Sequence, residues 1–177
     1  GTSLYGTGEI AGPLLRNGRR SICWNTDAYA YKEDTPSLYQ SHPWVLAVRP
    51  DGTAFGVLAD TTFRCEIDLS TGIKFTADGP DEGFPIIVID RDSPQEVLMG
   101  LADLTGRMPM PPKWALGYHQ CRYSYNPESR VRDIAGEFRR RDIPCDAIWL
   151  DIDYMDAYRV FTFDQSQFPD PAKLNAD

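Results

Sequence analysis

The hydrophobic pattern changes near Ser93, and this change most constrains what the chain can fold into. Before it, short strand-like runs alternate with turns rich in glycine and proline. The stretch "HPWVLAVRPDGTAFGVLAD" (42–60) predicts one hairpin, and "RCEIDLSTGIKFTAD" (64–78) predicts a second. The runs "GTSLYGTGE" at the start and "FPIIVID" (84–90) predict two further strands. We therefore expect an antiparallel β-sandwich over about residues 1–89.

From Ser93 onward the apolar residues recur at helical spacing. The segment from Ser93-Pro94 to Gly106 has a typical helix start, an apolar stripe and a glycine stop. After the proline-rich connector "MPMPPKW", a strand (114–121), a helix and a second strand (142–153) follow. Asn126 and Pro127 fit an N-cap and a first helical position. A βαβ unit predicts that its two strands run parallel.

Polar clusters follow both of these strands. One is "RYSY" (122–125), and the other is "DIDYMD", which holds Asp151, Asp153 and Asp156. The carboxyl ends of parallel strands are the usual ligand sites of α/β folds, so the two clusters should meet. Asp151 and Asp153 share a face if the strand continues that far. The alternative is a solvated strand end, and the residues alone leave both readings open.

Metal and cofactor chemistry are poorly supported. The acids of "DIDYMD" lack the glycine and the spacing of a calcium-binding loop, and bulky side chains stand between them. A phosphatase-like Asp-x-Asp motif would continue with a small residue and Thr, where this chain has Tyr154 and Met155. We expect no metal and no cofactor. The cysteines form no Cys-x-x-Cys pair, and we expect buried free thiols at Cys23, Cys65, Cys121 and Cys145.

Charge and hydropathy argue against nucleic acid and a membrane as partners, and one aromatic loop suggests a sugar. The net charge is −8 and no basic footprint is present, which argues against nucleic acid. No apolar run is long enough to span a bilayer, so no membrane partner is expected. The loop "WNTDAYAY" (24–31) places aromatic rings around Asp27, as sugar-binding surfaces do. The alternative is a loop whose rings cover the end of the sandwich.

His119, inside an apolar strand, is expected to be packed and hydrogen-bonded.

Seven stretches, spread over nearly the whole chain, together resemble glycoside hydrolase family 31, the α-glucosidases and their relatives. They are "YGTGE", "WNTD", "SLYQSHPWVL", "GVLADTT", "PPKWALGYHQCRYSY", "DIDYMD" and "FTFDQSQFPDP". The resemblance implies α+β and α/β architecture: a galactose-mutarotase-like β-sandwich (1–92), a connecting helix and linker (93–113), and the start of a (β/α)8 barrel (114–177). The nearest subgroup resembles plant-type neutral or heteroglycan α-glucosidases.

The resemblance also implies an activity and site residues. Family members release terminal α-linked glucose with retention, so an α-glucosyl oligo- or polysaccharide is the expected partner. Asp151 matches a carboxylate that binds hydroxyls of the terminal glucose, with Ile152 and Tyr123 beside it; Asp27 matches an acid reaching toward the next sugar. Asp153 is expected to support Asp151 by hydrogen bonds, and Asp156 to be a loop or surface residue.

The resemblance places no catalytic residue in this chain. Both catalytic acids of the family lie downstream of the matched segment, and no Asp-Met-Asn-Glu-like motif is present. The sequence lacks an initiator Met and ends without a closing element, so we expect a piece of a longer protein. Two alternatives stay open: a carbohydrate-binding fragment without hydrolysis, and a relative that performs transglycosylation or lyase chemistry.

Overall fold

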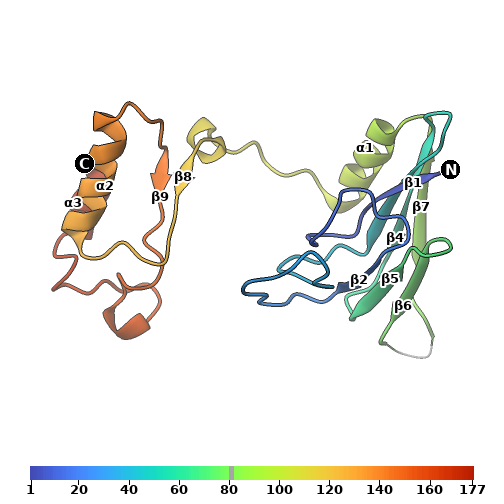
Figure 1. Cartoon of the computed structure of the whole chain (residues 1–177), viewed down its shortest axis with the longest axis horizontal. Helices are drawn as coiled ribbons and strands as arrows, with labels where there is room; N and C mark the ends of the chain where they lie inside the picture. Colours follow the sequence, from blue (N-terminus) through green and yellow to red (C-terminus); the bar gives the residue numbers. More distant parts are fainter. Residues whose placement is uncertain (80–81) are drawn as a thin grey trace. The chain divides into compact units, whose positions relative to one another are not determined.

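The computed structural model describes residues 1–79 and 82–177 and divides them into two compact units, Gly1–Arg107 and Met108–Asp177. Each unit is treated by itself below. The first unit contains seven strands and one helix (Figure 1): β1 Ser3–Gly6, β2 Arg20–Cys23, β3 Trp44–Val48, β4 Ala54–Ala59, β5 Cys65–Asp68, β6 Lys74–Ala77, β7 Ile86–Arg91 and α1 Pro94–Thr105.

The strands form two antiparallel sheets, as the sequence predicts. One sheet has the order β1-β3-β4-β7 and the other β2-β5-β6. Both predicted hairpins are present, because β3 pairs with β4 and β5 pairs with β6. Side chains on the two faces of β3 belong to two different hydrophobic cores. Val45 and Ala47 are fully buried with residues of the other sheet, whereas Trp44 packs with Val97 of α1.

Helix α1 begins and ends where the sequence predicts. The Ser93 hydroxyl accepts a hydrogen bond from the Glu96 backbone N–H at 3.3 Å, and Pro94 occupies the first turn. The helix ends at Gly106, whose φ of 92° suits glycine. Because α1 packs on β3, β4 and β7, it covers the face of the four-stranded sheet opposite the sandwich core. The exact domain boundaries given above stay a prediction.

The second unit contains the predicted βαβ arrangement in a shortened form. Its elements are η1 Lys113–Leu116, β8 His119–Gln120, α2 Glu128–Arg140, β9 Ala147–Ile148, η2 Asp156–Tyr158 and α3 Pro171–Ala176. Strands β8 and β9 pair in parallel, which confirms the prediction. The prediction of a strand from residue 114 was wrong, because the chain forms a 3-10 turn before β8. Strand β9 is also shorter than predicted and ends at Ile148.

The start of α2 differs from the prediction as well. Pro127 is the N-cap, without a side-chain cap, and Asn126 lies outside the helix. The Asn126 side chain instead donates to the Asp153 carbonyl oxygen at 3.3 Å. The helix begins one residue later than predicted, so Asn126 does not occupy the capping position.

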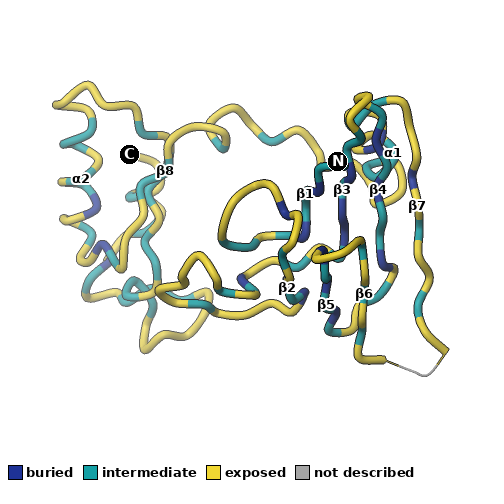
Figure 2. The backbone as a smooth tube through the Cα atoms, turned by 45° about the vertical axis from the view of Figure 1, so that its right-hand side comes forward, coloured by how far each residue is buried: buried dark blue, intermediate teal, exposed yellow. Residues whose placement is uncertain are grey.

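A small core joins the parts of the second unit. Phe168 is completely buried and packs with Tyr125 and Val131. Figure 2 shows a buried segment on α2, in dark blue, between intermediate and exposed ones. Ile148 and Leu150 pack on the same core, so these β9-side residues face α2. Among residues 1–79 and 82–177, no helix has the length and hydropathy needed to cross a bilayer.

The cysteines follow the prediction in part. All four are free thiols, and Cys23 and Cys65 are buried in the sandwich core. Burial, followed by the neighbouring Cys65, raises the pKa of the Cys23 thiol to about 11. Cys121 is exposed, so the expectation of burial was wrong there, because it follows the short strand β8 at the surface of this unit.

Candidate functional site

The carboxyl ends of β8 and β9 lie together, as the sequence predicts for a parallel pair. His119 is in register with Ala147, and Gln120 with Ile148. The loops that follow are joined by the Asn126 hydrogen bond to the Asp153 carbonyl oxygen. The polar segments after the two strands therefore form one cluster, which is our candidate functional site.

Asp151 occupies a special backbone position in this cluster. It lies three residues beyond the last residue of β9, is half-buried, and has a φ of 65°. Aspartate adopts the left-handed region more readily than most residues, and this backbone turns the chain away from the line of β9. Among the described residues, its carboxylate makes no hydrogen bond and no ion pair. Both oxygens are therefore available to accept hydrogen bonds from a ligand.

Asp153 does not support Asp151 in the way that the sequence suggested. Its carboxylate accepts a hydrogen bond from the Tyr158 hydroxyl at 3.2 Å, and no hydrogen bond joins it to Asp151 in the described part of the chain. The expected shared strand face is also absent, because β9 ends at Ile148 and Asp151 has a left-handed φ. Asp153 instead holds the turn that contains η2. Asp156 is exposed, as expected, and forms an ion pair with Arg159.

Tyr123 and Ile152 are the other predicted site residues of this unit. Their side chains are 75% and 37% exposed, so both can contact a ligand. The pKa of Tyr158 is raised, first by its hydrogen bond and proximity to Asp153 and then by Tyr123. Asp153 holds the Tyr158 hydroxyl, and Tyr123 follows β8 in the same cluster of loops.

Asp27 belongs to the first unit, in the loop after β2. It is exposed, and so are the surrounding rings: Trp24 is 56%, Tyr29 94% and Tyr31 56% exposed. This exposure contradicts the alternative in which the rings cover the end of the sandwich core. The loop presents a carboxylate among open aromatic faces, which suits stacking on a sugar.

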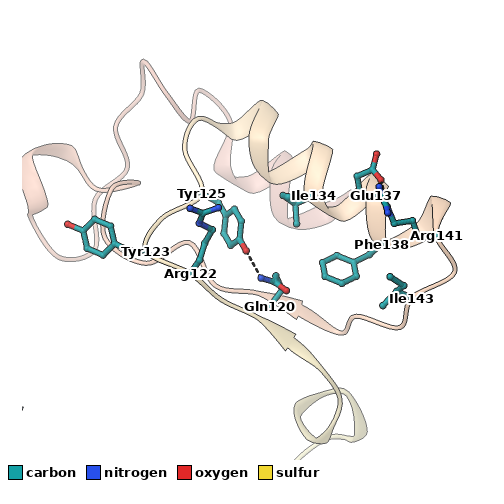
Figure 3. A pocket seen from close by; sticks show the side chains of 9 residues that line it. All are labelled: Gln120, Arg122, Tyr123, Tyr125, Ile134, Glu137, Phe138, Arg141 and Ile143. Atoms are coloured by element: carbon teal, nitrogen blue, oxygen red, sulfur yellow. Dashed lines mark hydrogen bonds and ion pairs between the residues drawn. The ribbon is translucent and has the colours of Figure 1, made fainter. Parts of the chain in front are cut away.

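A separate cavity of about 640 Å³ lies on the helix side of β8. Figure 3 shows its lining between α2 and the strand, where Tyr125 accepts a 2.6 Å hydrogen bond from Gln120. Tyr123 lies at one end, but neither Asp151 nor Ile152 lines the cavity. Glu137, at its wall, pairs with Arg141 and Arg140, which lower its pKa to about 2. Because neither Asp151 nor Ile152 lines it, this cavity is distinct from the candidate site.

The sequence did not reveal an aromatic group on the side of β8 and β9 that faces away from α2. His119 Nδ1 accepts from the Trp149 indole N–H at 3.2 Å, and its Nε2 lies 3.3 Å from the Trp114 carbonyl oxygen. An indole N–H only donates, so Nδ1 carries no proton and Nε2 carries it. The expectation that His119 is packed and hydrogen-bonded is confirmed. The alternation of side chains along a strand could have indicated this arrangement. Tyr118 contacts Phe138 of α2, so the next residue, His119, faces away from the helix.

No metal centre accompanies these groups in residues 1–79 and 82–177, where no three His, Cys, Asp or Glu side chains are arranged to hold an ion. The chemistry available at the strand ends is therefore that of a free carboxylate, aromatic faces and an apolar side chain. Such a set recognises hydroxyl-rich, uncharged ligands.

Comparisons with known proteins agree on one family. Residues 1–68 match the family described as "Glycosyl hydrolase 31 N-terminal galactose mutarotase-like domain". Residues 108–177 match "Glycosyl hydrolases family 31 TIM-barrel domain". The two matched segments fall in the two compact units of the structure.

Individual relatives extend the match over the whole chain. Alpha-glucosidase 2 of Bacillus thermoamyloliquefaciens is 48% identical over 98% of this chain and 22% of its own length. The crystal structure of a family 31 alpha-glucosidase from Bacteroides thetaiotaomicron is 54% identical, with a TM-score of 0.88 over 100% of this chain and 30% of its own. A Flavobacterium johnsoniae dextranase of the same family, complexed with isomaltotriose, is 32% identical with a TM-score of 0.81.

The chain spans between a fifth and a third of the length of these relatives. The N-terminal domain match falls on the unit with the antiparallel sheets, and the TIM-barrel match falls on the unit with the parallel strand pair. The chain belongs to glycoside hydrolase family 31.

Proposed function

We propose that the full-length protein is a retaining α-glucosidase, and that this chain supplies part of its sugar-binding site. The observation that carries the proposal is the position of Asp151, an unpaired carboxylate at the end of a parallel strand in a chain 48% identical to an α-glucosidase. Active sites of barrel enzymes lie at this end of the strands.

Asp151 would hold the terminal glucose by accepting hydrogen bonds from two of its hydroxyls. Ile152, directly beside it and 37% exposed, would form an apolar wall, and Tyr123, 75% exposed, an aromatic face. Sugars present both hydroxyls and CH faces, so this combination recognises the ligand from two sides. Asp27, in the aromatic loop of the first unit, would bind a sugar of an α-glucosyl oligo- or polysaccharide.

Hydrolysis with retention requires two further carboxylates, and we assign neither of them to a residue of this chain. Retaining glycosidases use a nucleophile and an acid/base about 5–5.5 Å apart, with a covalent glycosyl intermediate. None of the acids at the strand ends is proposed for either role. The relatives extend well beyond this chain, which covers 22% of one α-glucosidase, so there is room for both residues downstream.

The proposal is tested by incubating the full-length protein with maltose, isomaltose and a longer α-glucan, and by identifying the products. Free glucose from the non-reducing end supports an α-glucosidase. Transfer products would indicate transglycosylation, an unsaturated or anhydro sugar would indicate a lyase, and binding without turnover would indicate a carbohydrate-binding protein. Isomaltose belongs in the panel because the similar dextranase is described in complex with isomaltotriose.

The isolated 177-residue polypeptide is expected to show no glycosidase turnover. The reason is that it carries the sugar-binding carboxylate but neither catalytic acid. Release of glucose from maltose or of the chromophore from a chromogenic α-glucoside is measured with purified polypeptide. A mock purification from the same host serves as the control for contaminating enzymes. Turnover above that control would mean that an acid within this chain is catalytic.

His119 is expected to position the strand that leads to Asp151. In the full-length protein, His119→Leu removes the acceptor for the Trp149 N–H, two residues before Asp151. Trp149 then loses the contact that orients the segment leading to Asp151, and a small misplacement of a binding group lowers the rate, so kcat/KM should fall about tenfold. His119→Asn places an amide oxygen near the former Nδ1 and should retain most of the activity. Equal losses in both variants, measured by steady-state kinetics, would contradict a role for this hydrogen bond.

A further inference from the structure

Three residues with unpaired buried polar atoms line one small cavity in the first unit, and none of them is a candidate site residue. The atoms are Thr7 Oγ1, Arg16 Nε and Ser21 Oγ, and none has a hydrogen-bond partner among the described residues. The three residues are 4%, 7% and 4% exposed. All three line one cavity of about 30 Å³, which has room for one water-sized occupant.

Leaving these atoms without partners would be costly. A buried polar group without a hydrogen bond destabilises the folded state, and a buried charge without a counter-charge does so more strongly. Natural structures therefore provide a partner for nearly all such groups. Three neighbouring exceptions in a single cavity point to an occupant that bonds to all of them.

The charge of Arg16 indicates what kind of occupant this is. Its terminal nitrogens donate to the carbonyl oxygens of Ala11 and Ile10 at 3.0 and 3.1 Å, which leaves Nε–H as the free donor. No carboxylate pairs with Arg16 in the part of the chain that the structure describes. Burial, and then the positive charge of Arg19, lowers the pKa of Arg16, so this guanidinium lies in a positive environment.

The charged side chains near Arg16 do not neutralise its guanidinium. Arg19 pairs with Glu33 at 3.6 Å, and Arg20 pairs with Asp68 at 2.9 Å. Glu33 and Asp34 also line the cavity, but Glu33 is engaged by Arg19 and both acids are exposed to solvent. A negative charge inside the cavity would therefore compensate Arg16 where the surrounding acids do not.

We propose that this cavity binds a small monovalent anion, namely chloride. The guanidinium N–H can only donate, and the Thr7 and Ser21 hydroxyls can each donate as well, so all three atoms can bond to one anion. The volume of about 30 Å³ suits a small ion better than phosphate or sulfate. The bound ion would connect the loop that holds Arg16 to the end of β1, where Thr7 follows Gly6, and to β2, which contains Ser21.

The proposal is tested by the thermal stability of the full-length protein in chloride and in gluconate at equal ionic strength. A ligand that binds only the folded state raises the unfolding temperature in a saturable way, and we expect this for chloride and not for gluconate. Ser21→Ala removes one hydrogen bond to the ion and should raise the half-saturating chloride concentration about tenfold. Arg16→Met should abolish the response.

Ser129→Ala, at an exposed serine of α2, is the matched control and should respond to chloride like the unmodified protein. Ser21→Ala keeps the test decisive if Arg16→Met fails to fold. Crystals grown in bromide should give an anomalous peak beside Arg16 Nε. An identical unfolding temperature in the two salts, an unchanged chloride response in Ser21→Ala, or a water in place of bromide would each overturn the proposal. None of these readouts depends on glycosidase activity.

Discussion

In the full-length protein, Asp151→Ala and Asp151→Asn are each expected to lower kcat/KM by at least about a hundredfold, equivalent to about 2.7 kcal/mol. A carboxylate that accepts two sugar hydroxyls contributes about 1.5–3 kcal/mol per hydrogen bond. Part of this binding energy is realised only in the transition state, so kcat should fall together with kcat/KM. The fold should survive, because Asp151 makes no hydrogen bond or ion pair with the described residues.

Steady-state kinetics and circular dichroism test this expectation together. Asp133→Ala is a suitable control, since Asp133 is an exposed acid on α2 in the same unit. It should change kcat/KM only slightly. A folded Asp151→Ala variant with near-normal efficiency would mean that Asp151 is a solvated strand end with no part in sugar binding.

Phe168→Ala is expected to be the most destabilising single change in the second unit, at about 3–5 kcal/mol. Phe168 is completely buried, and its ring centroid lies 6.3 Å from that of Phe163. It packs against Val131 of α2 and Tyr125 of the loop after β8. Its loss would therefore leave a cavity beneath the loop that carries Tyr123 and Asn126.

Hydrogen exchange of the full-length protein measures this effect locally, because residues 119–168 should exchange faster in the variant. The same substitution at Phe161, whose side chain is 97% exposed, is the control and should change stability by no more than about 0.5 kcal/mol. Comparable loss of protection in both variants would contradict the assignment of Phe168 to the core.

The parts of the fold that could be predicted are those fixed by neighbouring residues. The turns at Pro50–Gly52 and Ser70–Gly72 define both hairpins, since turn chemistry sets strand pairing locally. The caps of α1 are likewise local. The length of a strand depends on its tertiary partners, so the apolar run from residue 114 could not distinguish a 3-10 turn from a strand. The N-cap prediction was wrong because α2 begins one residue later; Asn126 lies outside the helix and donates to Asp153, which is 27 residues away.

The candidate site was predictable in position but not in detail. The strand-end pattern identified Asp151 as a ligand candidate, and the family resemblance gave it a role. The left-handed backbone of Asp151 and the pairing of Asp153 with Tyr158 depend on how the loop closes, and no local pattern encodes that. The contact of His119 with Trp149 follows from the register of β8 and β9. The proposed chloride site joins residues 7, 16 and 21, which have no motif in common.

The anomeric form of the glucose released from an aryl α-glucoside, whose other product is not a sugar, tests the central claim most directly. A proton NMR time course with the full-length protein follows the two anomers before they equilibrate. A retaining α-glucosidase should produce α-glucose first, because two successive displacements restore the original configuration. Initial formation of β-glucose, or the absence of any glucose from a folded full-length protein, would contradict the account.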